Sequence, residues 1–166
     1  LFGRGVRPAY ALPANAPAWV VAVERVASRY APPSDPSPAA KAQFNYVRIK
    51  LLMDPIAKLI ADIAGEERGV LGEVLDIGTG RGQLPILLVE LGRATKASGV
   101  DWDASKIEDG KRAAGERPSL PVSLSQGDAR AAEVAPADTV LLIDLLHYFR
   151  VDEQDAILRR AARAVR

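Results

Sequence analysis

A glycine-rich turn preceded by an acidic residue is the strongest chemical signal in the sequence. Residues 74–82 read Val-Leu-Asp-Ile-Gly-Thr-Gly-Arg-Gly, and a helical pattern begins directly after them. Glycine adopts positive φ angles easily and lets the backbone approach a ligand closely. The start of a helix presents free N–H groups at the positive end of its dipole. The turn therefore predicts a ligand site, with the candidate residues Asp76, Gly78, Thr79, Gly80 and Gly82.

The spacing of this turn distinguishes between two classes of cofactor. A dinucleotide fingerprint requires G-x-G-x-x-G, and Gln83 stands where its third glycine should be. The carboxylate of Asp76 would sit badly beside a pyrophosphate, whereas it would attract the ammonium and sulfonium groups of S-adenosylmethionine. The pattern favours S-adenosylmethionine, and a plain strand-to-helix turn is the alternative.

Two further acidic residues end the next two apolar segments of the chain. Asp101 could accept hydrogen bonds from both hydroxyls of a ribose, and Asp128 could accept one from an adenine amine. Beside them, Trp102 is a candidate to lie against the adenine face, and the Ala129 N–H is a candidate donor to a ring nitrogen. Helix capping by Asp101, a turn at Asp128 and simple packing of Trp102 are the alternatives.

Short apolar runs that alternate with helical patterns position these residues. Strands are predicted over residues 74–77, 97–101, 122–125 and 139–143, and helices over residues 84–91, 104–114 and from Asp152 to the end. Such alternation favours an α/β fold with a parallel sheet, and right-handed crossovers give the strand order 3-2-1-4 with helices on both faces. The carboxyl ends of parallel strands share one edge, where open α/β sheets bind ligands. Asp76, Asp101 and Asp128 should therefore meet at that edge.

The first part of the chain has a different pattern. An irregular arm is predicted over residues 1–15, a proline-rich linker over 31–38, and helices from Pro17 to Tyr30, Ala39 to Met53 and Asp54-Pro55 to Ala64. The pattern changes at Gly72, so we predict a helical extension over residues 1–69 and an α/β core over residues 70–166. The extension should form a lid over the carboxyl edge. From such a lid Tyr46 and Arg48 could reach the carboxylate of the cofactor or the substrate, and solvated helix positions are the alternative for both.

Several segments resemble a known enzyme family, the class I S-adenosylmethionine-dependent methyltransferases. The segments that match its successive motifs are 76–82, Gly99-Val100-Asp101, Gly127-Asp128-Ala129 and Ala137-Asp138-Thr139-Val140. The resemblance covers about Val70 to Arg166 and implies a Rossmann-like fold with S-adenosylmethionine as cofactor. It also implies that Gly78, Gly80 and Gly82 line the methionyl part of the cofactor, that Asp101 binds the ribose and that Asp128 binds the adenine.

The number of strands departs from this family. Its sheet typically has seven strands, whereas four are predicted here, so we expect the C-terminal strands to be missing from the fifth onward. The fourth strand is a continuous apolar run, Val140-Leu141-Leu142-Ile143, and unpaired strand edges recruit other chains. We therefore expect either a longer native polypeptide, which is favoured, or a second copy that covers the edge in a homodimer.

Two residues near the end of the fourth strand are candidates to act on the methyl acceptor. His147, the only histidine, could serve as a general base where the acceptor must lose a proton, and Asp144 could orient the substrate. Cytosine C5 methylation needs a cysteine nucleophile, and the chain has no cysteine. The Asn-Pro-Pro-Tyr-type signature of amino-methylating enzymes is absent too. A small-molecule, lipid or natural-product acceptor is therefore favoured, and no metal site is predicted.

Composition limits the remaining function classes. The net charge of +1 gives no global field that attracts nucleic acid, so no nucleic-acid partner is expected. No apolar run approaches the roughly 20 residues that span a bilayer, and the lack of cysteine fits a cytoplasmic location. A non-catalytic methyltransferase-like binding module, and with less support an NAD-dependent oxidoreductase, are the alternative functions.

Overall fold

A four-stranded parallel sheet forms the centre of the molecule. The computed structural model describes residues 13–32, 34–65 and 67–166. The strands are β1 (Glu73–Ile77), β2 (Lys96–Asp101), β3 (Val122–Gln126) and β4 (Thr139–Leu141). They are ordered β3-β2-β1-β4, and every neighbouring pair is parallel. The predicted fold class and strand order are confirmed.

The position of β1 in the sheet creates a place for a ligand. The chain runs outward from β1 to β2 and β3 on one side, and then returns to place β4 on the other side of β1. Pairing with β2 continues to Ile77 opposite Val100, and pairing with β4 to Asp76 opposite Leu141. The loops after β1 and β4 therefore diverge at the carboxyl edge, and such a reversal of strand order opens a crevice in α/β sheets.

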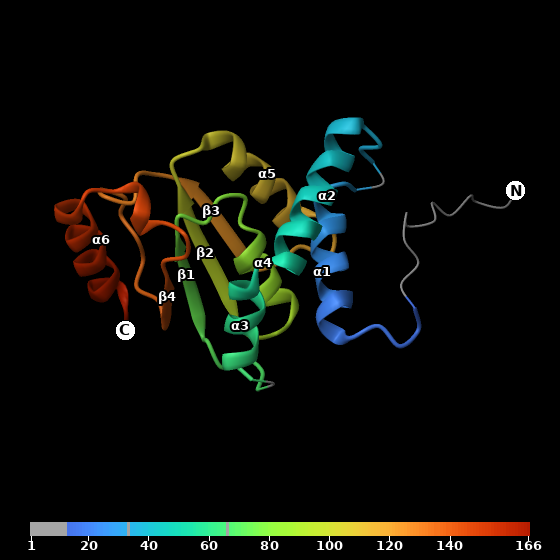
Figure 1. Ribbon diagram of the computed structural model, residues 1–166, viewed down its shortest axis with the longest axis horizontal. Helices are drawn as coiled ribbons and strands as arrows, with labels where there is room; N and C mark the ends of the chain where they lie inside the picture. Colours follow the sequence, from blue (N-terminus) through green and yellow to red (C-terminus); the bar gives the residue numbers. More distant parts are fainter. Residues whose placement is uncertain (1–12, 33, 66) are drawn as a thin grey trace, which may run out of the picture.

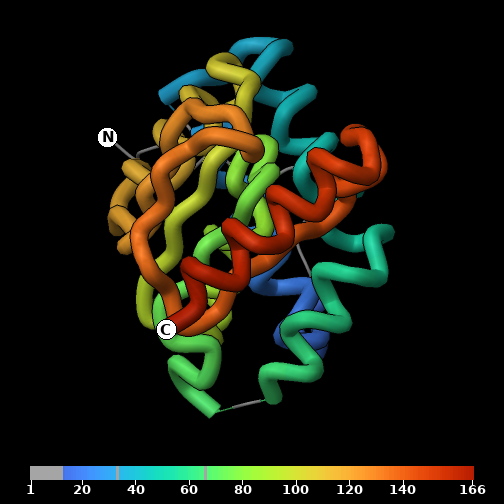
Figure 2. The backbone as a smooth tube through the Cα atoms, turned by 90° about the vertical axis from the view of Figure 1, so that its left-hand side faces the viewer, coloured from blue at the N-terminus to red at the C-terminus, as the bar shows by residue number. Residues whose placement is uncertain are grey.

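Helices cover both faces of the sheet, as predicted, and a further layer lies outside one of them (Figure 1). The helices are α1 (Ala18–Arg29), α2 (Pro38–Met53), α3 (Pro55–Ile63), α4 (Gln83–Glu90), α5 (Ala104–Gly115) and α6 (Val151–Ala164). Helices α4 and α5 lie on one face, and α1 and α2 pack outside them. Helix α6 crosses the opposite face, as Figure 2 shows. No helix in the described ranges is long and apolar enough to cross a membrane.

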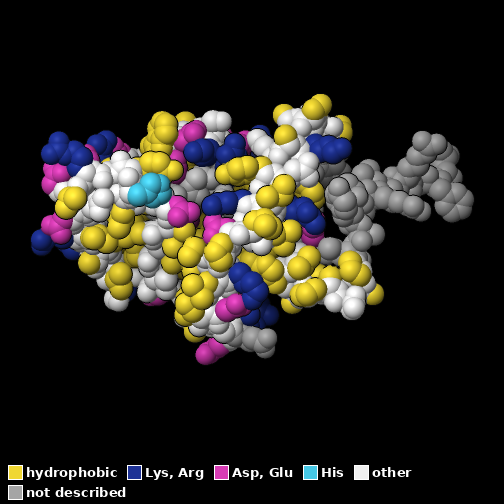
Figure 3. Space-filling model, in the orientation of Figure 1, with side chains coloured by type: hydrophobic (Ala, Val, Ile, Leu, Met, Phe, Trp, Pro, Cys, Tyr) yellow, Lys and Arg dark blue, Asp and Glu magenta, His cyan; other side chains and the backbone are white. Residues whose placement is uncertain are grey.

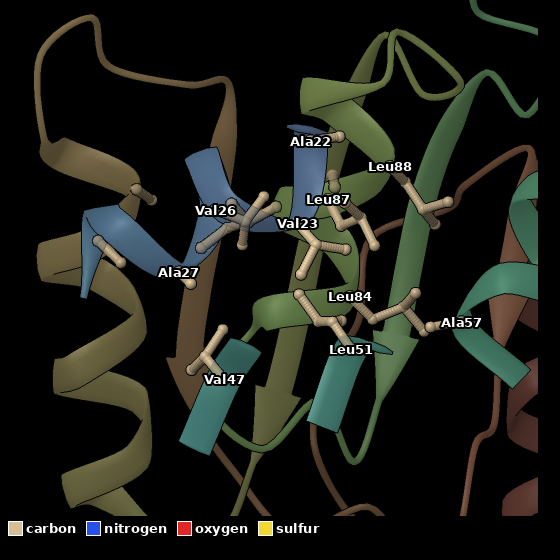
Figure 4. Packing of buried hydrophobic residues seen from close by; sticks show 14 of the residues in the cluster. Ala22, Val23, Val26, Ala27, Val47, Leu51, Ala57, Leu84, Leu87 and Leu88 are labelled. Carbon is tan, nitrogen blue, oxygen red and sulfur yellow. The ribbon is translucent and has the colours of Figure 1, made fainter. Parts of the chain in front are cut away.

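The N-terminal helices share a hydrophobic core with the α/β part. In Figure 4, Val23 of α1 and Leu51 of α2 lie beside Leu84 and Leu87 of α4. Val47 of α2 points towards α1, and all of these residues are buried. A second buried cluster on the other face of the sheet joins β1 to α6. The division into a 1–69 extension and a 70–166 core stays a prediction, and the arm predicted for residues 1–15 lies mostly outside the described residues.

Capping residues explain where α2 and α3 begin. Ser37 accepts a hydrogen bond from the Ala40 N–H at the start of α2, and Asp54 accepts one from the Ile56 N–H at the start of α3. Each helix then has proline at its first position, where the missing N–H costs nothing. Asp54-Pro55 is therefore the cap and restart signal that the sequence predicted.

Two predicted boundaries near the C-terminus were wrong. Strand β4 ends at Leu141, because its pairing with β1 stops there and the chain turns at Asp144, which has a φ of 50°. Asp152 does not cap the last helix: Arg150 is the N-cap, and its N–H donates to Glu153. Asp152 lies in the first turn instead, where a carboxylate still interacts favourably with the helix dipole.

The residues that follow α6 return to the start of β4. Val165 forms an isolated parallel bridge with Ala137, and the N–H of Arg166 donates to the Ala137 carbonyl at 2.9 Å. This contact lies two residues before β4, and residues 139–141 pair only with β1 within the described part of the chain.

Candidate functional site

A cleft of about 510 Å³ opens at the carboxyl edge of the sheet. It brings together nine of the residues that the sequence singled out: Asp76, Gly78, Thr79, Gly80, Asp101, Trp102, Asp128, Ala129 and Asp144. Its other lining residues come largely from the α2–α3 corner, the loop after β4 and the start of α4. The corner at Lys50 to Ala57 forms one wall, so residues of α2 and α3 border the cleft, and the lid itself stays a prediction.

The glycine-rich turn after β1 has a left-handed backbone at three positions. The φ angles are 86° at Gly78, 59° at Gly80 and 73° at Gly82. A Cβ on Gly80 would meet no atom within 4 Å, so this residue faces open space at the cleft. Gly82 is the N-cap of α4 and does not line the cleft. A Cβ at this position would lie 2.5 Å from the side chain of Leu124. The absence of a side chain at Gly82 thus lets the turn pack closely against Leu124 of β3.

Asp76 is a buried carboxylate with an unsatisfied oxygen. The residue is only 2% exposed, and its Oδ1 has no hydrogen-bond partner among the described residues. Burial raises the pKa of Asp76 to about 7, against the lowering effect of the nearby Thr79 hydroxyl, and the charge of Asp101 adds to the rise. The Thr79 hydroxyl is buried beside this carboxylate and makes no hydrogen bond of ordinary geometry among the described residues. Burying an unpaired charge costs free energy. A cationic ligand that donates a hydrogen bond would therefore stabilise the ionised carboxylate.

Asp101 ties the second strand to the glycine-rich turn. Its Oδ2 accepts a hydrogen bond from the Gly80 N–H at 2.8 Å, and its Oδ1 accepts one from the Asp103 N–H at 3.0 Å. Asp103 is the N-cap of α5 and accepts from the N–H groups of Ser105 and Lys106, so Asp101 is not the helix cap. The indole of Trp102 is 73% exposed beside the cleft, where it is accessible to a planar ligand.

Asp128 forms an ion pair that the sequence analysis missed. Arg130 binds both oxygens of its carboxylate, with distances of 2.6 Å from Nη2 to Oδ2 and 3.0 Å from Nε to Oδ1. These hydrogen bonds lower the pKa of Asp128 to about 2. Arg130 also donates to Glu153 at 2.8 Å and lies over the ring of Phe149. The two-residue spacing of Asp128 and Arg130 was visible, but Glu153 and Phe149 approach only through tertiary packing.

The wall formed by the α2–α3 corner and the loop after β4 combines apolar and charged side chains. Lys50 of α2 places Nζ 2.7 Å from Asp54 and 3.6 Å from Asp144. The sequence analysis identified Asp144 but not Lys50, because their contact joins α2 to the loop after β4. Around them the cleft is lined by Leu51, Ala57, Ile143 and Leu145. This part of the cleft suits a ligand with apolar surface and at least one polar group.

Three predicted substrate or catalytic residues lie outside the lining of the cleft. The His147 ring stacks against Tyr148, with centroids 4.0 Å apart, and it is the exposed cyan side chain in Figure 3. Arg48 pairs with Glu24 of α1, and the exposed Tyr46 has the Arg81 guanidinium over its ring. Arg48 and Tyr46 therefore contact neighbouring elements of the fold, while Lys50 on the same helix lines the cleft.

Comparison with known proteins places the α/β part in a family. A family model described as a methyltransferase domain matches residues 74–166. This match begins at β1 and continues to the last residue, so it includes the glycine-rich turn and all three acidic strand ends. No curated protein matches the sequence.

Solved structures share the fold at low sequence identity. YcgJ from Bacillus subtilis is 24% identical, with a TM-score of 0.56, over 66% of this chain and 45% of its own. CalS10, an amino pentose methyltransferase from Micromonospora echinaspora solved with bound S-adenosylmethionine, is 19% identical, with a TM-score of 0.55, over 68% and 46%. Magnesium protoporphyrin IX methyltransferase from Synechocystis PCC 6803, also solved with bound S-adenosylmethionine, is 21% identical, with a TM-score of 0.56, over 74% and 58%. The chain thus spans about half the length of these proteins.

Proposed function

The chain belongs to the class I methyltransferases, and from this membership we propose that it binds S-adenosylmethionine in the cleft and transfers the methyl group to a small-molecule, lipid or natural-product acceptor. The observation that carries the proposal is Asp76, whose buried oxygen has no partner among the described residues. The ammonium group of S-adenosylmethionine would supply both the missing hydrogen bond and the missing positive charge. The residues present therefore fit the cofactor.

Each part of the cofactor has candidate partners along the carboxyl edge. Asp76 and the open backbone at Gly78 and Gly80 would hold the methionyl part. Asp101 would accept hydrogen bonds from the ribose, at the end of β2. The planar indole of Trp102 and the Asp128–Ala129 segment would hold the adenine. Asp101 and Asp128 already act as hydrogen-bond acceptors in the free protein. Both oxygens of Asp128 accept from Arg130, so the adenine amine would share this carboxylate with the guanidinium.

The acceptor would lie between the α2–α3 corner and the loop after β4. S-adenosylmethionine supplies an activated methyl group on its sulfonium, so the protein has to align the acceptor and exclude water. The apolar side chains Leu51, Ile143 and Leu145 would exclude water, while Asp144 and Lys50 would orient a polar group. His147 stays a candidate base for an acceptor that loses a proton, and it would have to turn from the surface to reach the cleft.

Two observations support a small acceptor. The cleft has a volume of about 510 Å³, which is within the range of small-molecule sites, and two of the solved structures with this fold are named as methyltransferases of an amino pentose and of a porphyrin. The face drawn in Figure 3 intersperses basic and acidic side chains, so it offers no basic patch for nucleic acid. A cytoplasmic location and a homodimer remain predictions.

Replacing Asp101 with Ala should weaken the binding of S-adenosylhomocysteine by roughly 1–3 kcal/mol, the scale of lost hydrogen bonds to a charged acceptor. Isothermal titration calorimetry measures the effect. The matched control is Asp103→Ala, which removes the same charge two residues away together with the cap of α5. That variant should lose about 1 kcal/mol of stability and keep its affinity.

A titration with NAD on the wild-type protein separates the proposed function from the oxidoreductase alternative. We expect a saturable heat of binding in the titration with S-adenosylhomocysteine and no heat of binding in the titration with NAD. Binding of NAD alone, or equal losses of affinity in the Asp101 and Asp103 variants, would contradict the assignment of this carboxylate to the cofactor.

A further inference from the structure

A buried tyrosine connects the first helix to the glycine-rich turn. Tyr30, at the C-terminal end of α1, is only 1% exposed, and its hydroxyl donates to the carbonyl oxygen of Arg81 at 2.7 Å. Burial raises the pKa of Tyr30 above its ordinary value, so the hydroxyl keeps its proton and donates throughout the physiological pH range. Residues 51 positions apart are thus joined at the turn that lines the cleft.

The side chain of the same arginine is held from another direction. The Nε of Arg81 lies 3.3 Å from Oδ2 of Asp109 on α5, a buried carboxylate, in an ion pair that lacks hydrogen-bond geometry at Nε. Asp109 also accepts hydrogen bonds from Gln43 of α2 at 2.9 Å and from Arg112 at 2.7 Å. The end of α1 therefore contacts the backbone of Arg81, and α5 contacts its guanidinium. Helix α2 in turn contacts Asp109 of α5 through Gln43.

Close packing reinforces this arrangement at Gly110 of α5. A Cβ at Gly110 would lie 2.4 Å from the Arg81 carbonyl oxygen, so only glycine lets the helix approach the turn so closely. The carbonyl that Tyr30 binds is thus in contact with α5 as well. Neither the sequence motif nor its resemblance to a family includes Tyr30, Asp109 or Gly110.

The turn needs such support because of its composition. Three glycines with left-handed backbone are separated by single residues, and glycine loses more conformational freedom on ordering than any other residue. Arg81 lies between Gly80, which faces the cleft, and Gly82, which packs against β3. Fixing Arg81 at both its backbone and its side chain therefore restricts the dihedral angles on either side of it.

We propose that Tyr30 and Asp109 are positioning residues, which hold Arg81 so that the glycine-rich turn is already in its cofactor-binding conformation before the cofactor arrives. Helix α1, which ends at Tyr30, then contributes to cofactor binding without touching the cofactor. The proposal rests on the proposed function for the identity of that ligand. A preorganised turn binds more tightly because less entropy is lost on binding.

The test uses Tyr30→Phe, which removes one hydroxyl and keeps the buried ring, and Asp109→Asn, which removes the charge and keeps the shape. Hydrogen exchange of the Gly80, Arg81 and Gly82 amides reports on the turn in the free protein, and calorimetry with S-adenosylhomocysteine reports on affinity. We expect both variants to exchange these amides about tenfold faster and to bind about fivefold to tenfold more weakly, the scale of one lost hydrogen bond.

A buried residue of the same helix provides the control. Val26 of α1 is fully buried and contacts the shared core rather than the turn, so Val26→Ala should lower the melting temperature and leave turn exchange and affinity unchanged. Unchanged exchange and affinity in Tyr30→Phe, or an equal effect of Val26→Ala, would overturn the proposal. If the wild type fails to bind S-adenosylhomocysteine, the proposed function fails, and the exchange rates still decide whether Tyr30 and Asp109 order the turn.

Discussion

Replacing Gly80 with Val should abolish measurable binding of S-adenosylhomocysteine, a loss of at least roughly 100-fold or about 2.7 kcal/mol. Gly80 has a φ of 59°, and a side chain there would extend into open space at the cleft. A β-branched residue would both strain the left-handed backbone and occupy volume that the cofactor needs. Calorimetry measures the affinity, and urea unfolding measures the stability.

Gly65→Val is the matched control for this substitution. Gly65 follows α3 and has a φ of 69°, and a Cβ there would likewise meet no atom within 4 Å. The two variants should therefore lose similar stability, while only Gly80→Val should lose the ligand. If both bind normally, the turn does not contact the cofactor, and if both fail to bind, backbone strain rather than the site explains the loss.

Asp76→Asn should move affinity and stability in opposite directions. At pH 8 the wild-type carboxylate is largely ionised, because its pKa is about 7, and it should attract the cationic cofactor. The amide has no charge, so we expect the affinity for S-adenosylmethionine to fall roughly 10-fold to 100-fold, within the energy range of a hydrogen bond to a charged group. The free variant should be at least as stable as the wild type, since an uncompensated buried charge has been removed.

The pH dependence supplies an internal control for the same pair of proteins. Because the folded-state pKa of Asp76 is raised, its contribution to stability is fully present below the ordinary pKa of 3.8 and is lost as the pH rises through about 7. The stability advantage of the Asn variant should therefore grow between pH 5 and pH 8, and the difference in affinity should shrink at pH 5. Parallel pH profiles for both proteins, in urea unfolding and in calorimetry, would contradict this role of Asp76.

The positions of the three acidic strand ends could be predicted from the sequence because they follow from local pattern and topology. Asp101 ends β2, Asp76 stands one residue before the end of β1, and Asp128 follows the end of β3 by two residues. A parallel sheet must bring such strand ends to one edge. The cap at Asp54 was equally predictable, because the signal and the helix that it starts are adjacent in the chain.

Contacts between distant segments could not be predicted in this way. Lys50 meets Asp144, and Arg48 meets Glu24, only because α2 packs at a particular angle against α1 and the loop after β4. The pairing of Arg130 with Glu153 depends likewise on the position of α6. Strand β4 was predicted too long because hydrophobicity continues to Ile143, whereas its pairing with β1 stops at Leu141.

The most direct test of the central claim, that the cleft holds S-adenosylmethionine through the glycine-rich turn, is a titration of the 15N-labelled chain with S-adenosylhomocysteine followed by NMR. We expect saturable shifts of the amides of Gly78, Thr79 and Gly80, together with those of Asp101 and Trp102. The amides of the last turn of α6, residues 161–164, should stay unchanged, whereas its first turn contacts Arg130 through Glu153. Shifts that do not saturate, or that leave residues 78–80 unaffected while others move, would contradict the account.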